Sequence, residues 1–204
     1  EEGQATLMGG ATEQYEQVKP APVEEFAQKT LALMVEASGV IHGSQDPDTT
    51  RRALVQAAAR ATDFENIAFV RRIDDGAGVE VLCRNDGAGS EGLRISKSML
   101  RKALTGTVVV SDAMKSTDAS IALSLENMSV RRAICIPVQC AGTHFGFLYM
   151  DDGTRSRVHA EERLHEAASI AEALARMAGQ NLSNLAHTQE MVQLLVDASE
   201  LNDE

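Results

Sequence analysis

The sequence lacks the features of a membrane-spanning or secreted chain. Its longest uninterrupted apolar runs are only a few residues long, which excludes a transmembrane helix. No basic segment followed by an apolar stretch marks a secretory signal, and without an initiator methionine we expect Glu1 to lie within a longer protein. Three cysteines, Cys83, Cys135 and Cys140, are too few and odd in number for a disulfide framework. We therefore expect a reducing, cytoplasmic setting.

Positive charge is also scarce. Lysine and arginine total 19 against 30 aspartates and glutamates, a net charge of −11. This balance excludes general binding to nucleic acid or to an anionic membrane surface. The acidity lies at the ends: the net charge is −5 over residues 1–25 and −7 over 158–204, against +1 over 26–157. The middle of the chain therefore has the charge balance of a globular core, and a 44% hydrophobic content excludes disorder of the whole chain.

The chain divides into four segments. Residues 1–22 are rich in Gly, Glu and Gln and end at two prolines, which predicts a flexible linker. Residues 23–42 form a helix with a narrow apolar stripe, suited to a dimerisation and signalling role. Residues 43–157 form the core, and 158–204 form one long helix of coiled-coil type. The N-terminal stripe steps by four and three residues through Phe26, Thr30, Leu33, Ala37 and Val40.

The long last helix carries a heptad seam. Its members are Leu164, Ala168, Ala171, Ala175, Ala178, Leu182 and Leu185, and the seam continues either through Val192 and Val196 or through Met191, Leu194, Ala198 and Leu201. We expect that one small core cannot cover both this seam and the N-terminal stripe, so we predict a parallel homodimer. The predicted interface comprises Phe26, Leu33, Val40, Leu164, Ala171, Ala178, Leu182 and Leu185.

Between the terminal helices the pattern is mixed. Asp46 and Pro47 begin a helix over 49–64, and alternating apolar residues predict a hairpin of strands over Asn66–Ile73 and 79–84. A short strand at 93–95 leads to a helix that Ser96 begins and Gly106 ends. A buried strand, a polar loop and a weakly amphipathic segment over 121–130 follow, and a second hairpin occupies 132–152.

Two segments of this order resemble a known family. They are SKSMLRKALTGTVVVSDA (96–113) and VRRAICIPVQCAGTHFGFLYMDD (130–152), and both resemble motifs of the GAF domain. Arg132 stands where the family often has Ser, and Val158 stands where an aromatic residue usually opens the exit helix. The resemblance covers about residues 25–185 and implies an α+β fold, with a central antiparallel sheet, helices on its faces, and flanking N-terminal and C-terminal coiled-coil helices.

The resemblance also implies a function. A GAF domain is a sensory or regulatory module, here expected to relay a signal to an output domain of a larger bacterial-type signalling protein. The sequence contains none of the common catalytic or nucleotide-binding motifs: a P-loop, a dinucleotide-binding fingerprint, a GxSxG elbow or an HExxH helix. We therefore expect no catalysis by this segment. The alternatives are a thiol redox enzyme similar to the free methionine sulfoxide reductases, which the cysteines inside apolar runs disfavour, and a purely structural dimerisation module.

Several known GAF ligands fit poorly. The residue set of cyclic-nucleotide-binding members is absent. A covalently bound bilin would need a cysteine near a histidine and several aromatic residues, whereas this chain has five Phe, two Tyr and no Trp, and Cys140 and His144 are separated by a predicted hairpin turn. The five histidines are scattered, so we expect no metal and no cofactor. By resemblance, a pocket for a small anionic or polar ligand would take hydrogen bonds from Asp112, Ser116, Ser120 and Ser124, a wall from Met128 and a positive charge from Arg131 or Arg132. Alternatively, the serines cap turns and the arginines flank a strand in solvent.

Overall fold

The computed structural model describes residues 23–73, 78–86, 92–153 and 161–202. The predicted linker over 1–22 lies outside these residues. The helices are α1 (Val23–Gly43), α2 (Pro47–Ala61), α3 (Lys97–Ala103), the 3-10 turn η2 (Ala113–Lys115), α4 (Ala119–Glu126) and α5 (Glu161–Asn202). The strands are β1 (Asn66–Ile73), β2 (Gly78–Arg84), β3 (Val108–Val110), β4 (Ala133–Cys140) and β5 (Thr143–Asp151).

The five strands form one sheet in the order β2-β1-β5-β4-β3, and every neighbouring pair is antiparallel. The hairpins β1–β2 and β4–β5 are the two predicted from alternating apolar residues, and β5 joins them by pairing with β1. The predicted α+β class is therefore confirmed. The short strand expected at 93–95 does not form, because this segment runs straight into the first turn of α3.

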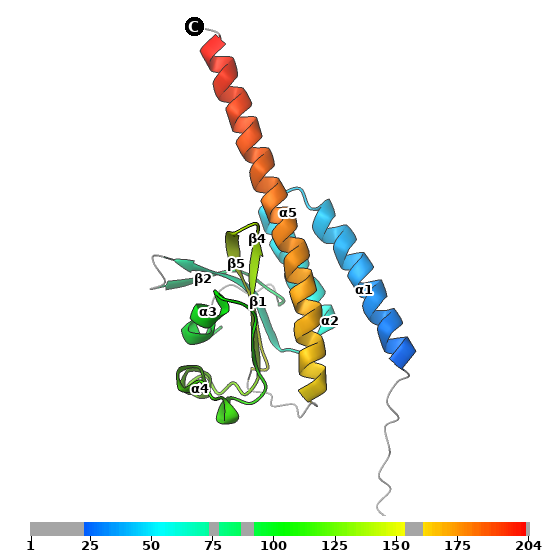
Figure 1. Ribbon diagram of the computed structural model, residues 1–204, viewed down its shortest axis with the longest axis vertical. Coiled ribbons are helices and arrows are strands. Elements are labelled where there is room, and N and C mark those ends of the chain that lie inside the picture. The colour runs from blue at the N-terminus through cyan, green and yellow to red at the C-terminus, as the bar shows by residue number, and fades with distance from the viewer. Residues whose placement is uncertain (1–22, 74–77, 87–91, 154–160, 203–204) are drawn as a thin grey trace, which may run out of the picture.

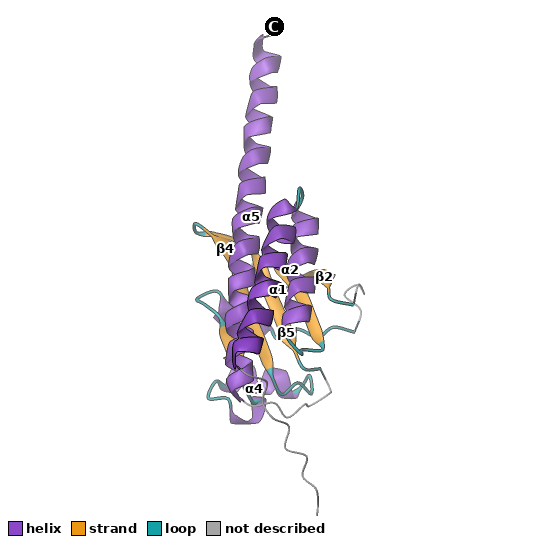
Figure 2. Ribbon diagram, turned by 90° about the vertical axis from the view of Figure 1, so that its right-hand side faces the viewer, coloured by secondary structure: helices purple, strands orange, loops and turns teal. Residues whose placement is uncertain are grey.

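The sheet is the middle of three layers. Helices α2 and α5 cover one face, with α1 packed on their outer side, and α3, η2 and α4 cover the other (Figures 1 and 2). Successive side chains of β5 alternate between these faces, as a strand requires. Leu148 and Met150 join the core under the long helices, whereas Phe147 and Tyr149 join the core under α3 and α4.

Local capping explains where the helices begin. Asp46 caps α2 by accepting a 2.8 Å hydrogen bond from the backbone N–H of Thr49, with Pro47 in the first turn. Ser96 caps α3 through the N–H of Met99. Asp118 caps α4, and hydrogen bonds from Ser120 and Lys102 lower the pKa of its carboxyl to about 2.

Helix α5 has two parts with different surroundings. Its N-terminal half lies on β4 and beside α1 and α2, while its C-terminal part extends beyond the rest of the domain (Figure 1). Gly179 marks the close approach, because a Cβ there would lie 2.6 Å from the carbonyl oxygen of Gln139 in β4. At the same level Asn181 is buried and donates to the hydroxyl of Thr50 at 2.9 Å, which ties α5 to α2.

The predicted seam of α5 faces inward. Leu164, Ala171, Ala178 and Leu182 are at most 3% exposed within a single chain. The expectation that one small core could not cover this seam is therefore wrong: the sheet and its two neighbouring helices bury it. No helix within the described ranges meets the length and hydropathy needed to span a membrane.

Candidate functional site

The predicted polar ligand residues occupy caps and ion pairs. Asp112 caps η2 through the N–H of Met114 and lies 3.7 Å from the guanidinium of Arg131. The hydroxyl of Ser116 accepts from the N–H of Asp118, and the exposed Ser120 donates its hydroxyl to the same aspartate. These groups stabilise the chain turns between β3 and α4, as the alternative interpretation of the serines anticipated.

The remaining predicted residues are not gathered at one place. Ser124 is half-buried on α4, and Met128 is half-buried just after it. Arg131 is exposed, whereas the adjacent Arg132 is 7% exposed. Of the seven residues, only Met128 belongs to the wall of the cavity described below.

Arg132 has a structural partner on the other side of the strand. Its Nε donates to Asp152 at 3.3 Å, and its guanidinium lies 5.7 Å from the ring centroid of Phe64. The same Asp152 carboxylate also accepts the backbone N–H groups of Arg131 and Arg132. The predicted role of Arg132 as a ligand contact beside the 112–124 loop is therefore wrong. A buried arginine already paired with a carboxylate holds the start of β4 to the end of β5.

A polar cavity lies at this end of the sheet, where β1 begins and β5 ends. It has a volume of about 340 Å³, within the lower range of small-molecule sites. Its wall comprises Glu65, Asn66, Gly92, Arg94, Met128, Ser129, Val130, Asp151 and Gly153. These residues come from the ends of two central strands, the segment before α3 and the segment after α4.

The Asp151 carboxylate is the buried polar group of the cavity. It is 1% exposed, and its Oδ1 accepts hydrogen bonds from Asn66 Nδ2 at 2.7 Å and from the Gly153 N–H at 2.8 Å. Burial raises the pKa of this carboxyl, and the nearby Asp152 and Glu65 raise it further, while the two hydrogen bonds oppose the shift.

Tyr149 stands behind Asp151 on the same face of β5. Its side chain is fully buried, and its hydroxyl has no hydrogen-bond partner among the residues that the structure describes. Burial, together with the neighbouring Asp151 carboxylate, raises the pKa of the hydroxyl well above its usual value. A buried hydroxyl without a partner is costly, by about 1–3 kcal/mol. It therefore marks this part of the core as a place where an additional polar group would be stabilising.

The sequence analysis missed Asn66, Arg94, Ser129 and Asp151. A sequence signal existed for one of them, since Asp151 follows the apolar run FLYM and an acid at the end of a buried strand is unusual. Asn66 and Arg94 carried no signal, because their place at the cavity depends on how β1 and the 92–96 segment meet in space.

The predicted dimer-interface residues fall into four groups. Leu164, Ala171, Ala178 and Leu182 are buried within the chain, so they offer no surface to a partner. Leu33 and Leu185 are half-buried, and Val40 is 52% exposed. The side chain of Phe26 lies outside the described residues.

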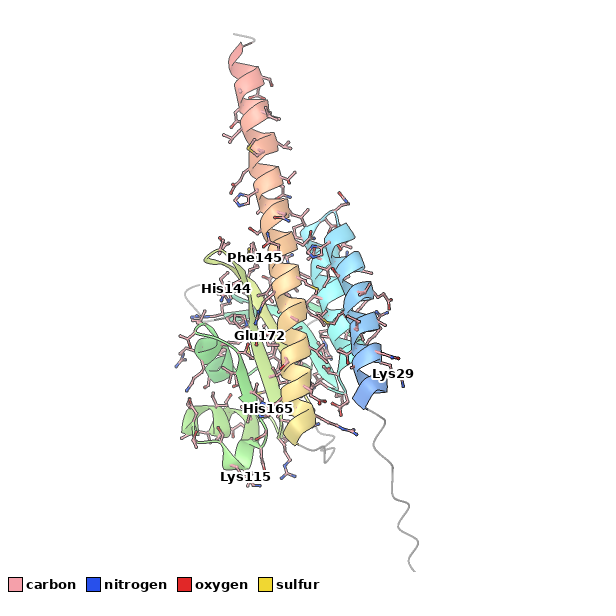
Figure 3. The ribbon with its side chains drawn as sticks, turned by 45° about the vertical axis from the view of Figure 1, so that its right-hand side comes forward. Lys29, Lys115, His144, Phe145, His165 and Glu172 are labelled. Carbon is pink, nitrogen blue, oxygen red and sulfur yellow. The ribbon has the colours of Figure 1, made fainter. Side chains whose placement is uncertain are left out.

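The cysteines and histidines of the described residues form no metal-ligating cluster, and Cys83 and Cys135 lie on opposite faces of the sheet. Cys83 contacts the core under the long helices and Cys135 the core on the opposite face of the sheet. Burial raises the pKa of the Cys83 thiol to about 11 and that of Cys135 still higher. His144 at the β4–β5 turn and His165 on α5 lie apart (Figure 3), and no cluster of metal-ligating side chains occurs in the described ranges.

Comparison with known proteins agrees with this architecture. The sequence model of the GAF domain matches residues 46–182, which is more than half of the chain. The chain belongs to the GAF family. The matched range leaves out α1 and the C-terminal part of α5, so the GAF core consists of the sheet, α2 to α4 and the packed half of α5. Comparison of the sequence with curated proteins finds no match.

Solved structures with this fold include photoreceptor domains. The chromophore-binding domain of the bacteriophytochrome RpBphP3 from R. palustris has a TM-score of 0.63 at 12% identity, covering 84% of this GAF chain and 66% of that one. The photosensory core module of the Stigmatella aurantiaca phytochrome has a TM-score of 0.66 at 14% identity, covering 89% and 41%. The GAF domain of the cyanobacteriochrome TePixJ has a TM-score of 0.51 at 16% identity, covering 72% and 95%. This chain therefore spans less than two thirds of the first two structures, and at these identities the likeness concerns the fold.

Proposed function

We propose that this GAF domain is a non-catalytic regulatory module that relays a change in its core along α5 to an output domain. The observation that supports it is the dual packing of α5. One half is fixed against β4 and α2, and the other half extends beyond the domain with apolar side chains in solvent (Figure 1). Because the helix is rigid, a displacement of the half that is packed in the core also moves the half that extends beyond the domain.

The extending part of α5 joins two copies of the chain. Met191, Val192, Leu194, Leu195 and Val196 are between 44% and 67% exposed. A helix in water gains most of its stability from packing of an apolar face, which this part of α5 does not find within its own chain. On the outer side of α1, Leu31 and Val35 are also exposed, at 66% and 65%. A second copy, aligned in parallel, would cover these residues in one helical bundle.

Charge opposes this association. Helix α5 contains seven acids and two arginines, so two parallel copies repel each other. Salt screens this repulsion, with a Debye length of about 10 Å at 0.1 M. The dimer should therefore become more stable as the ionic strength rises, which is the opposite of an interface held by ion pairs.

The test is multi-angle light scattering at several salt concentrations with a charge-insertion variant. Met191→Glu together with Leu195→Glu should convert the dimer to a monomer. The matched control, Gln189→Glu with Gln193→Glu, adds the same two charges on the opposite, polar side of the helix and should remain dimeric. Neither pair contacts the buried seam, so both proteins should keep the wild-type melting temperature within a few degrees. A monomeric wild-type chain at high salt contradicts the proposed relay through a dimer.

A further inference from the structure

We propose that the polar cavity at the base of the sheet binds a small zwitterion, a free α-amino acid, with its ammonium group at Asp151 and its carboxylate at Arg94. The proposal concerns a ligand of the same module but does not depend on its dimerisation. It rests on the charges of the cavity wall, on the buried groups at its inner end and on one unusual backbone position.

The charges on the wall favour a ligand of both signs. Asp151 and Glu65 supply negative charge, and Arg94 supplies positive charge. An anion alone would meet two carboxylates, and a cation alone would meet a guanidinium, at an energetic cost in each case. A zwitterion matches both, and a cavity of about 340 Å³ holds a molecule of amino-acid size rather than a large planar chromophore.

Arg94 is placed to receive a carboxylate. It is exposed and donates through one Nη to the carbonyl oxygen of Asn127 at 3.2 Å, which anchors it at the C-terminal end of α4. A guanidinium has five N–H donors in a planar fork, so one anchoring bond still leaves a bidentate edge. An arginine anchored in this way loses less side-chain entropy when it binds an anion.

The inner end of the cavity is suited to an ammonium group. Asn66 and the Gly153 N–H both bond to Oδ1 of Asp151, and this carboxylate lies in the cavity wall. An ammonium group has three donors, so it can bond the Asp151 carboxylate and a second acceptor of the wall together.

Ser129 in the cavity wall has a left-handed backbone. Its φ is +59°, and the N–H groups of Ser129 and Val130 bond to the carbonyls of Glu126 and Leu125, which is a Schellman ending of α4. Glycine is the preferred residue at this position, because any side chain there costs about 1 kcal/mol. The Ser129 hydroxyl therefore lies in the cavity wall at an energetic cost to the fold, where it can bond a ligand.

The first experiment measures the melting temperature of the full chain with each protein-forming α-amino acid at millimolar concentration. A binding amino acid at about a hundred times its Kd should raise the melting temperature by roughly 5–10 °C for a chain of this size. The methyl ester of that amino acid, which lacks the carboxylate, and its des-amino analogue, which lacks the ammonium group, should each give less than half of this rise. The proposal is overturned if no amino acid raises the melting temperature, or if either analogue binds as well as the parent.

The second experiment locates the site by calorimetric titration of the amino acid identified. Arg94→Gln should raise the Kd at least tenfold, whereas Arg101→Gln, a matched change of an exposed arginine on α3, should change it less than twofold. Asp151→Asn keeps an oxygen for Asn66 and Gly153 and should also raise the Kd at least tenfold. Ser129→Gly should raise the melting temperature of the free protein and weaken binding in the same variant. Unchanged affinity in Arg94→Gln and Asp151→Asn would place the ligand elsewhere and overturn the assignment. An amino acid that binds a monomeric wild-type chain would support this site while contradicting the dimer.

Discussion

Replacing Tyr149 with phenylalanine should stabilise the ligand-free domain. The hydroxyl of this residue is fully buried and has no hydrogen-bond partner in the described part of the chain. Burying this hydroxyl without a partner costs about 1–3 kcal/mol. Removing the oxygen atom also removes its van der Waals contacts, but these contribute less than that cost. We therefore expect the free energy of unfolding of Tyr149→Phe to rise by about 1 kcal/mol, which corresponds to a gain of roughly 2–4 °C in melting temperature for a domain of this size.

Urea unfolding of dialysed protein, followed by circular dichroism, measures this difference, and its sign decides the question. If the hydroxyl were instead hydrogen-bonded in the folded protein, Tyr149→Phe would lower the free energy of unfolding by about 0.5–1.5 kcal/mol. Tyr149→Leu serves as the control, because it removes both the ring and the hydroxyl and should cost about 2 kcal/mol through lost packing. A destabilised Tyr149→Phe would show that the hydroxyl is bonded in the free protein and would contradict this reasoning.

Three further outcomes follow from single contacts. Gly146→Ala should cost about 2–4 kcal/mol in urea unfolding, because φ is +153° and a Cβ would lie 2.5 Å from Cε1 of Phe69. Cys135 should react with a disulfide reagent at neutral pH only as slowly as the protein unfolds, because it is fully buried, and the half-buried Cys83 should react more slowly than an exposed thiol, because burial raises the pKa of both thiols. Rapid reaction of either would favour the redox-enzyme alternative. Since the pKa of Asp151 is raised in the folded state, its contribution to stability is fully present below pH 3.8 and is lost as the pH rises through the folded-state pKa. The free energy of unfolding of Asp151→Asn, relative to that of wild type, should therefore be highest at neutral pH. If the difference between the two free energies did not change with pH, the raised pKa of this carboxyl would be contradicted.

Much of the fold was predictable because its signals are local. The alternating residues of the two hairpins, and the capping side chains Asp46 and Ser96, act within a few positions of the chain, and the structure has those elements where the patterns put them. The seam of α5 shows the limit of such patterns. An Ala-rich stripe with steps of four and three indicates that one side of the helix is buried, but it has the same form whether β4 or a second copy covers it.

The candidate site was not predictable in the same way. The alternation of side chains along a strand predicts that Arg132 and Ala133 lie on opposite faces of the sheet. It does not predict which of the two faces packs against α3 and α4. That assignment depends on how the helices cross over the sheet, which only the complete fold determines. For this reason the sequence pointed to an arginine that is paired with Asp152, and it passed over Arg94, which lies at the cavity.

The geometry of β5 joins the two proposals. Asp151 and Tyr149 face the cavity side of the sheet, and Met150, which lies between them in the chain, belongs to the core under the long helices. A ligand that draws the Asp151 carboxylate inward must move the backbone on both sides of Met150, because adjacent residues of a strand share peptide planes. The core that contains Met150 also contains Leu174 and Ala178 of α5, so the displacement acts on the helix below the point where Asn181 fixes it to α2. Because close-packed cores transmit displacements between the elements that they contain, we expect this shift to tilt α5 about its attachment at Asn181. If Asn181→Ala uncouples the helix in this way, amino-acid binding should persist in the variant with a Kd close to wild type, while a spin-label pair at position 193, on the polar side of α5, no longer changes its distance on binding.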